Sequence, residues 1–144
     1  KDTIMETGGT FYEVVDLGFG RCKFALALPE GVDFYAGYHT RCIASKYVNV
    51  TRNYFEKKNM DVDIVKIEGS VELAPILGLS DAIVDIVETG TTLKENGLVV
   101  TEDVCQVSAR LIVNIASMKL RKAEIEELIV KIERYVQEQE AQKI

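Results

Sequence analysis

Hydrophobic residues in this chain fall into short runs separated by glycine, proline and polar residues, a pattern typical of strands that alternate with helices. Six apolar runs predict strands: residues 22–28, 42–45, 62–67, 82–87, 98–100 and 109–114. Cap residues and terminating glycines predict helices over residues 49–58, 71–77 and 91–96. The strand–helix order, repeated across residues 42–96, predicts a right-handed parallel α/β unit.

Both ends of the chain are expected to be helical. Residues 1–20 mix polar positions with apolar ones from Phe11 to Leu17, and they predict a short helix followed by a turn at residues 18–20. Toward the other end, apolar residues recur at three- and four-residue steps and predict a long amphipathic helix. This stripe consists of Ile125, Leu128, Ile129, Ile132 and Val136. We expect it to lie in the core or in an interface.

The segment from Asp81 to Leu93 carries the clearest functional signal. It is an apolar run that contains Asp85, and it continues into a Glu-Thr-Gly-Thr-Thr loop and the start of a helix. Loop N–H groups, threonine hydroxyls and the positive end of a helix can hold a phosphate. The acids upstream can accept ribose hydroxyls or face a hydrated Mg²⁺. Taken alone, the loop could equally be an ordinary capped turn.

The predicted strand order places this loop beside two others. Ligands of open parallel sheets bind beyond the carboxyl ends of the strands. Three loops follow such ends, at residues 46–49, 69–72 and 88–92. We therefore expect these loops to converge on one site.

Composition narrows the range of partners. The 144 residues are 47% hydrophobic and carry a net charge of -6 with no basic patch, so nucleic acid is not an expected partner. No apolar run has membrane-spanning length, and no signal peptide is visible. Cys22, Cys42 and Cys105 are widely spaced and His39 is the single histidine. These features favour free thiols in a reducing cytoplasm over a disulfide or a zinc site.

Longer stretches resemble a known family. The run from Gly69 to Pro75, the run from Asp81 to Leu93 and the sequence from Asn96 to Leu98 closely resemble ATP phosphoribosyltransferase, the first enzyme of histidine biosynthesis. Further matches lie at residues 16–22, 44–49, 51–52 and 111–114, so the resemblance covers essentially the whole chain. One departure is Val48, which stands where family members usually carry proline and predicts a less rigid loop.

The resemblance implies an α/β fold of the periplasmic-binding-protein type (type II), with two lobes, parallel-rich sheets flanked by helices, and a cleft between the lobes. Residues 1–40 and 113–144 are expected in the first lobe, and residues 41–112 in the second lobe with the phosphoribosyl pyrophosphate loop. Family catalytic chains extend before the position that matches Lys1. We therefore expect an incomplete first lobe, which puts the activity of this piece alone in question.

The resemblance also implies roles for single residues. Asp85 and Glu88 match catalytic positions near the ribose. The residues expected to bind phosphoribosyl pyrophosphate are Asp85, Glu88, Thr89, Gly90, Thr91 and Thr92, and those expected to bind the nucleotide are Asp2, Tyr47 and Glu72. Structural alternatives remain open: a helix-end partner for Asp85, a favourable dipole interaction for Glu72, and core packing for Tyr47. No residue is assigned as a direct metal ligand, because Mg²⁺ is expected to be carried by the pyrophosphate.

The implied reaction joins ATP to 5-phosphoribosyl 1-pyrophosphate. Adenine N1 attacks C1 of the ribose and pyrophosphate leaves, a step that needs two aligned anions and a neutralised leaving group more than covalent help from the protein. The resemblance to the short form of the family implies a homo-oligomer that also assembles with a regulatory subunit similar to histidyl-tRNA synthetase. The alternative is a non-catalytic ligand-binding or sensor protein of the same fold. The loop after residue 87 argues against that alternative, since an amino-acid sensor has no need of a sugar-phosphate cradle.

Overall fold

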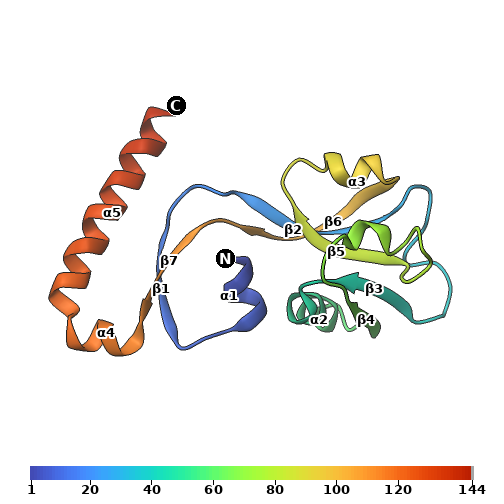
Figure 1. Ribbon diagram of the computed structural model, residues 1–144, viewed down its shortest axis with the longest axis horizontal. Coiled ribbons are helices and arrows are strands. Elements are labelled where there is room, and N and C mark those ends of the chain that lie inside the picture. Colours follow the sequence, from blue (N-terminus) through green and yellow to red (C-terminus); the bar gives the residue numbers. More distant parts are fainter. Residues whose placement is uncertain (144) are drawn as a thin grey trace. The chain divides into compact units, whose positions relative to one another are not determined.

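The computed structural model describes residues 1–143 and divides into two units, each with its own sheet (Figure 1). Unit 1 combines residues 1–21 with residues 107–143, and unit 2 is Cys22–Gln106. The strand that begins at Cys22 therefore belongs to unit 2, whereas the sequence analysis expected residues 1–40 together in the first lobe. The correspondence between these units and the lobes of a complete protein stays a prediction.

Unit 2 is built on a five-stranded mixed sheet with the strand order β4-β3-β5-β2-β6. Its elements are β2 (Cys22–Pro29), β3 (Arg41–Ser45), α2 (Val48–Lys57), β4 (Val62–Lys66), the 3₁₀ helix η1 (Val71–Leu73), β5 (Ala82–Val87), α3 (Thr91–Glu95) and β6 (Leu98–Val107). Strand β3 pairs in parallel with both β4 and β5, as the strand–helix order predicts, and β2 pairs antiparallel with β5.

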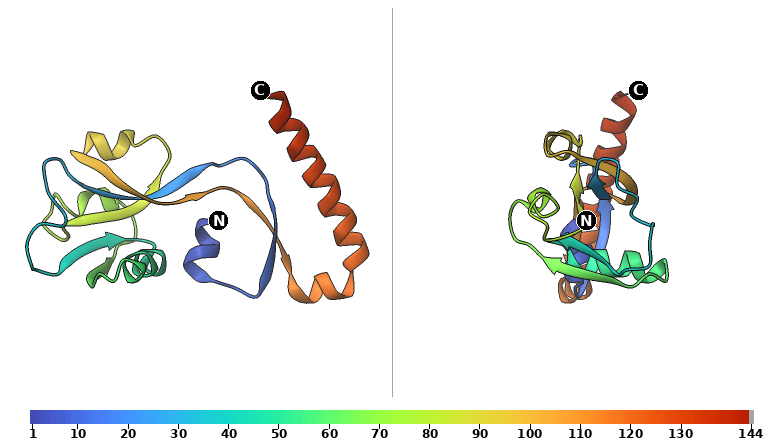
Figure 2. Two further views of the ribbon diagram at one scale, coloured as in Figure 1. Left: turned by 180° about the vertical axis from the view of Figure 1, so that it is seen from behind. Right: turned by 90° about the vertical axis from the view of Figure 1, so that its right-hand side faces the viewer.

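Both faces of this sheet are covered. Alternating residues of β2 and β5 divide into two buried clusters, one with Leu93 of α3 and Val71 of η1, the other with Phe55 of α2. Helices α2 and α3 accordingly lie on opposite sides of β2 and β5 (Figures 1 and 2). Burial on both faces explains why β2, β3 and β5 read as continuous apolar runs.

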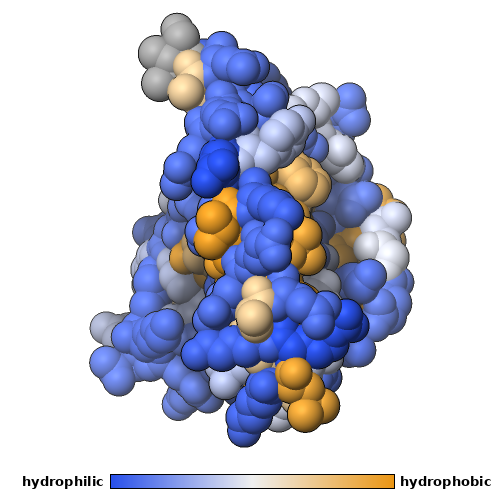
Figure 3. Space-filling model, turned by 90° about the vertical axis from the view of Figure 1, so that its left-hand side faces the viewer, coloured by the Kyte–Doolittle hydropathy of each residue, from blue (hydrophilic) through white to orange (hydrophobic). Residues whose placement is uncertain are grey.

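Unit 1 holds a two-stranded antiparallel sheet and three helices. Its elements are α1 (Asp2–Thr7), β1 (Phe11–Asp16), β7 (Arg110–Asn114), α4 (Ile115–Leu120) and α5 (Lys122–Gln142). The apolar stripe of α5 is only partly covered: Val136 lies against β1, while Leu128 is 54% exposed. Figure 3 shows hydrophobic side chains beside the mostly hydrophilic surface on this side of the molecule.

The expected helix over residues 1–20 is wrong in its second half. Gly8 and Gly9 end the helix after Thr7, and residues 11–16 form a strand that pairs with β7, nearly a hundred residues away. The same alternation of apolar and polar positions fits either element over so short a run. Pairing with the distant strand β7 makes residues 11–16 a strand.

Three further expectations need correction. Residues 71–77 form one 3₁₀ turn followed by further turns, because Pro75 and Gly78 limit regular helix there. The strand expected at residues 98–100 runs on to Val107 and includes the polar residues that follow Val100. Neither Asn49 nor Thr51 caps α2, which begins at Val48 after Tyr47. Val48 therefore occupies the first helical position, where the proline of other family members would be well tolerated.

Candidate functional site

The carboxyl ends of β3, β4 and β5 meet at one edge of the unit 2 sheet. These three parallel strands are neighbours in the order β4-β3-β5, and the chain leaves β3 toward β4 before it returns to pair β5 on the other side of β3. Such a reversal makes a topological switch point, beyond which a crevice forms for ligands. The loops at residues 46–49, 67–72 and 88–92 all follow this edge.

Asp85 is the acid of β5, and it lies two residues before the carboxyl end of the strand. It pairs with Ala25 of β2 and shares a sheet face with Val87 and with the cluster beneath η1 and α3. Its Oδ1 accepts a hydrogen bond of 2.8 Å from the N–H of Ile86. No cation is paired with it among the contacts of residues 1–143.

Burial raises the pKa of the Asp85 carboxyl above its ordinary value, and the Ile86 N–H opposes that rise. The carboxylate of Glu72 raises this pKa further, and the ammonium of Lys46 lowers it. Charges from the loops after β3 and β4 thus act on the acid in β5. Whether the three loops form one site stays a prediction.

The loop after β5 is open to solvent at its threonines. Glu88, Thr89, Thr91 and Thr92 are exposed, and Gly90 caps α3 with a φ of 79°. The hydroxyls of Thr89 and Thr91 lie 3.1 Å apart, and the N–H of Thr91 reaches Thr89 Oγ1 at 3.4 Å. Among the described contacts, no acceptor is recorded for the N–H of Thr92. These bonds partly order the loop, while its threonine side chains stay exposed.

A cavity of about 270 Å³ adjoins this loop. Its lining residues are Glu30, Gly90, Leu93, Lys94, Gly97, Leu98, Val99 and Val100. Gly90 is the one lining residue that belongs to the loop, and most of the others come from α3 and the start of β6. The loop is partly bonded internally and has space at Gly90, and its role in phosphate binding stays a prediction.

Tyr47 follows β3 and is partly buried. Its ring meets Phe24 of β2 edge-on, with 4.8 Å between ring centroids. Its N–H donates to Ser45 Oγ at 2.9 Å, and its carbonyl accepts from Thr51 Oγ1 at 2.8 Å. Two buried hydroxyls therefore hold the backbone of this residue. Their role was missed from the sequence.

Asp2, the third residue predicted for nucleotide binding, lies in α1 of unit 1. It lines a cavity of about 230 Å³. The other lining residues are Lys1, Thr3, Ile4, Thr7, Phe11, Arg110 and Ile112. The remaining predicted residues all belong to unit 2, so the structure groups Tyr47, Glu72 and the loop after β5 in one unit and Asp2 in the other.

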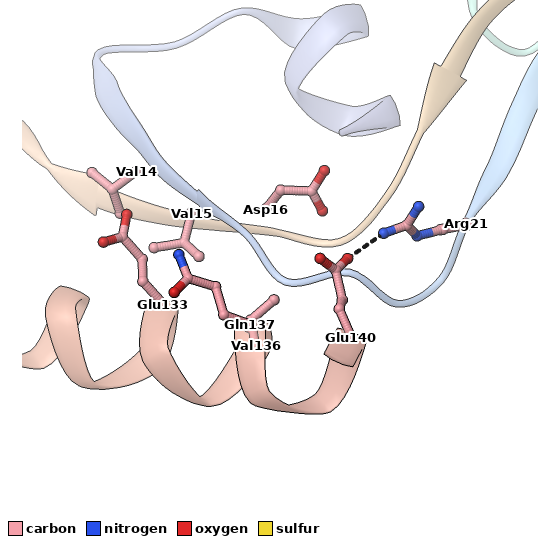
Figure 4. Close-up of a pocket in the computed structure, with 8 residues that line it drawn as sticks. All are labelled: Val14, Val15, Asp16, Arg21, Glu133, Val136, Gln137 and Glu140. Carbon is pink, nitrogen blue, oxygen red and sulfur yellow. Dashed lines mark hydrogen bonds and ion pairs between the residues drawn. The ribbon is translucent and has the colours of Figure 1, made fainter. Parts of the chain in front are cut away.

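A larger cavity, of about 400 Å³, lies in unit 1 between β1 and α5 (Figure 4). Val14, Val15 and Val136 supply its apolar wall, and Arg21 pairs with Glu140 at 2.6 Å beside it. It contains none of the predicted site residues. Its charged groups are Asp16, Arg21, Glu133 and Glu140, and the sheet edge of unit 2 remains the candidate site.

The donor set suits a Mg²⁺ held mainly by substrate phosphates. Across residues 1–143 no three His, Cys, Asp or Glu side chains are grouped so that they could hold a metal ion. Burial, and after it the charge of Glu72, raise the pKa of Asp85. Mg²⁺ commonly keeps several waters and takes one or two carboxylates together with phosphate oxygens.

Comparison with known proteins decides the family. The model of the family described as "HisG: ATP phosphoribosyltransferase" matches residues 1–134. The chain belongs to this family. An ATP phosphoribosyltransferase of Clostridium kluyveri is 62% identical over 138 residues, which is 96% of this chain and 63% of that protein. One from Clostridium botulinum is 59% identical, over 96% of this chain and 65% of that protein. The chain thus spans less than two thirds of the length of these relatives.

Solved structures give the same family and fold. The ATP phosphoribosyltransferase (HisG:HisZ) complex of Thermotoga maritima has a chain 33% identical, with a TM-score of 0.83 over 96% of this chain and 68% of that one. The arginine-binding protein of T. maritima is only 14% identical, with a TM-score of 0.57 over 90% of this chain and 57% of that one. The second likeness concerns the fold alone, and the α/β, periplasmic-binding-protein-like class predicted from the sequence is confirmed. None of the helices formed by residues 1–143 has the length and apolar character needed to cross a membrane.

Proposed function

We propose that this chain is the catalytic part of a short-form ATP phosphoribosyltransferase, which condenses ATP with 5-phosphoribosyl 1-pyrophosphate to give N1-(5-phosphoribosyl)-ATP and pyrophosphate in histidine biosynthesis. The observation that carries the proposal is the exposed threonine–glycine loop after β5, which follows a partly buried acid at the switch point of a parallel sheet. Family membership and relatives near 60% identity support it.

In this proposal the loop N–H groups and the hydroxyls of Thr89, Thr91 and Thr92 bind the 5-phosphate of the ribose. The N-terminal end of α3, at Gly90, adds a favourable dipole. Asp85 and Glu88 accept ribose hydroxyls. A carboxylate so close to C1 also favours the positive charge that develops there when the bond to pyrophosphate breaks.

Tyr47, Glu72 and Asp2 are proposed to orient the ATP, so that adenine N1 lies in line with the bond that breaks. Alignment of two bound reactants can supply a large part of such a rate enhancement. Mg²⁺ bound to the pyrophosphate would neutralise charge on the leaving group. Asp85 must be ionised to act, and a cationic or hydroxyl-donating ligand nearby opposes the rise in its pKa that burial causes.

The proposed partners follow the solved complex. That structure contains HisG with HisZ, and we propose a regulatory subunit of the same kind for this protein, in a hetero-oligomer that also contains further copies of this chain, located in the cytoplasm. A non-catalytic sensor of the same fold is less favoured, because its relatives in the structure comparison share only about 14% identity with this chain.

Titration calorimetry tests the proposal directly. The natural protein is titrated with phosphoribosyl pyrophosphate and Mg²⁺, then with ATP, and pyrophosphate release is measured in parallel. We expect saturable binding of the sugar phosphate and turnover once ATP is added. Absence of both, with binding of a free amino acid such as arginine, would instead establish the sensor alternative.

A further inference from the structure

Ser45 occupies the switch point between β3 and β5. It is the last residue of β3 and has no exposed surface. The parallel register of these two strands runs from Ile43 opposite Ala82 to Ala44 opposite Ile83. One residue further on, Ser45 Oγ donates to the carbonyl of Val84 at 2.6 Å. A side-chain hydroxyl therefore continues the link between the strands where their backbone pairing ends.

The same hydroxyl also accepts the N–H of Tyr47 at 2.9 Å. Ser45 Oγ thus joins two groups: the carbonyl that directly precedes Asp85 in β5, and the backbone of the predicted nucleotide-binding aromatic after β3. Burial of a hydroxyl is costly unless its hydrogen bonds are made, and here both its donor and its acceptor capacities are used.

A second buried hydroxyl acts on the other side of Tyr47. Thr51 has no exposed surface, and its Oγ1 donates to the Tyr47 carbonyl at 2.8 Å, beside the helical bond of 3.0 Å from its own N–H. Phe24, also fully buried, supports the ring. The N–H, the carbonyl and the ring of Tyr47 are therefore each held by a buried neighbour.

We propose that Ser45 and Thr51 are positioning residues for the nucleotide, acting through Tyr47. Their buried hydroxyls fix Tyr47 at a set distance from the Asp85 strand, so that adenine and ribose are presented to each other in register. The inference rests on the proposed function and deepens it. The simpler alternative is that both hydroxyls merely satisfy buried polar groups without consequence for ATP.

Steady-state kinetics of the natural protein separate these alternatives. Ser45→Ala and Thr51→Val each remove one hydroxyl with little change in volume. We expect each to raise the KM for ATP by about 5- to 20-fold, as loss of a hydrogen bond to a buried group suggests. The KM for phosphoribosyl pyrophosphate is expected to change less than twofold, because its loop follows β5, which is paired on both sides. Thr51→Ser retains the hydroxyl and is expected to fall between wild type and Thr51→Val.

The matched control is Thr101→Val on β6. Thr101 is exposed, and its Oγ1 donates to the carbonyl of Leu26 at 3.3 Å, a longer hydroxyl-to-backbone bond within unit 2 that does not involve Tyr47. This variant is expected to leave both KM values unchanged. A Tyr47→Ala background completes the test. If Ser45 acts through Tyr47, adding Ser45→Ala there has no further effect on the KM for ATP.

Amide exchange separates failure of this inference from failure of the proposed function. In Ser45→Ala the Tyr47 amide is expected to exchange at least tenfold faster than in wild type, whether or not the protein turns over ATP. Faster exchange of the Tyr47 amide with an unchanged KM for ATP would overturn the positioning role. Unchanged exchange would mean that Ser45 Oγ does not hold the Tyr47 backbone. A wild-type protein that binds neither substrate would refute the proposed function instead.

Discussion

Asp85 illustrates how a partly buried acid can lower the stability of the folded protein. Its pKa is raised on folding, chiefly by burial, so the folded protein holds this proton at a pH where the unfolded chain has released it. The free energy of unfolding therefore decreases as the pH rises from the ordinary value of 3.8 through the raised pKa. Strained or destabilising groups of this kind are typical of sites that await a ligand.

Asp85→Asn should therefore make the protein more stable and less active. The amide oxygen can keep the hydrogen bond from the Ile86 N–H, while the buried charge is lost. We expect a higher unfolding temperature than wild type at pH 7.5 and no difference below about pH 3.8, where wild-type Asp85 is protonated in both states. Turnover should fall roughly 10- to 100-fold, the value of a hydrogen bond to a charged group. Wild-type turnover in this variant would make Asp85 structural only.

Gly90 offers the sharpest test of the phosphate loop. Its φ of 79° suits glycine, and a Cβ there would meet only Val87 Cγ1, at 3.8 Å. Gly90→Ala should thus cost about 1–2 kcal/mol of stability from backbone strain alone. We also expect at least a tenfold loss of affinity for phosphoribosyl pyrophosphate, measured by calorimetry, because the strain moves the loop N–H groups.

Gly78→Ala provides the matched control. Gly78 has a φ of 71° with open space around it, and it precedes the amino end of β5, at the opposite end of the strand from the loop. The Gly78→Ala variant should lose a similar amount of stability and retain its affinity for phosphoribosyl pyrophosphate. Equal losses of affinity in both variants would mean that the loop has no special part in binding.

Among the secondary-structure elements, α2 and β6 are joined by one acid. Glu102 of β6 accepts hydrogen bonds from Lys58, at the end of α2, from Tyr54 within that helix, and from Tyr35. Burial would raise the pKa of Glu102, but these donors outweigh it and hold the pKa below its ordinary value. The carboxylate therefore stabilises the folded unit above an unfolded-state pKa of 4.5, and this contribution disappears as the pH falls through the lower folded value.

Glu102→Gln should accordingly destabilise the protein by about 1–2 kcal/mol at pH 7. Urea denaturation at pH 7 and at pH 3 measures the difference, which is expected to shrink at the lower pH. Asp103→Asn is the control, since Asp103 pairs with Lys23 at 2.5 Å but is half exposed and should contribute less than about 0.5 kcal/mol. A larger loss for Asp103→Asn than for Glu102→Gln would refute the assignment.

The elements that were predicted correctly from the sequence are those with local signals. β2, β3 and β5 are continuous apolar runs, and the phosphate-binding role of the loop that follows β5 stays a prediction. β1 could not be recognised, because its partner β7 lies far along the chain. The role of Ser45 was also hidden, since a serine at the end of an apolar strand gives no sign of which carbonyl it will meet.

For the molecule as a whole, the net charge of -6 opposes the proposed anionic substrates. Attraction of the substrate phosphates must therefore be local, from loop N–H groups, the amino end of α3 and Lys46. The charge of Lys46 also lowers the pKa of Asp85. A surface of net negative charge does not attract these anions over long distances. The affinity should consequently depend strongly on Mg²⁺, which neutralises the pyrophosphate.

The expected dependence on Mg²⁺ can be tested together with the question of which unit binds the sugar phosphate. Saturating phosphoribosyl pyrophosphate with Mg²⁺, at about 100 times its Kd, should stabilise the protein by about 2.7 kcal/mol. Chelation of Mg²⁺ should remove most of that gain. Hydrogen exchange should show protection at residues 45–49 and 88–92 of unit 2, and none at residues 11–16 of β1, which border the 400 Å³ cavity of unit 1. Protection confined to β1 and α5 would move the binding site to that cavity and contradict the assignment to the sheet edge.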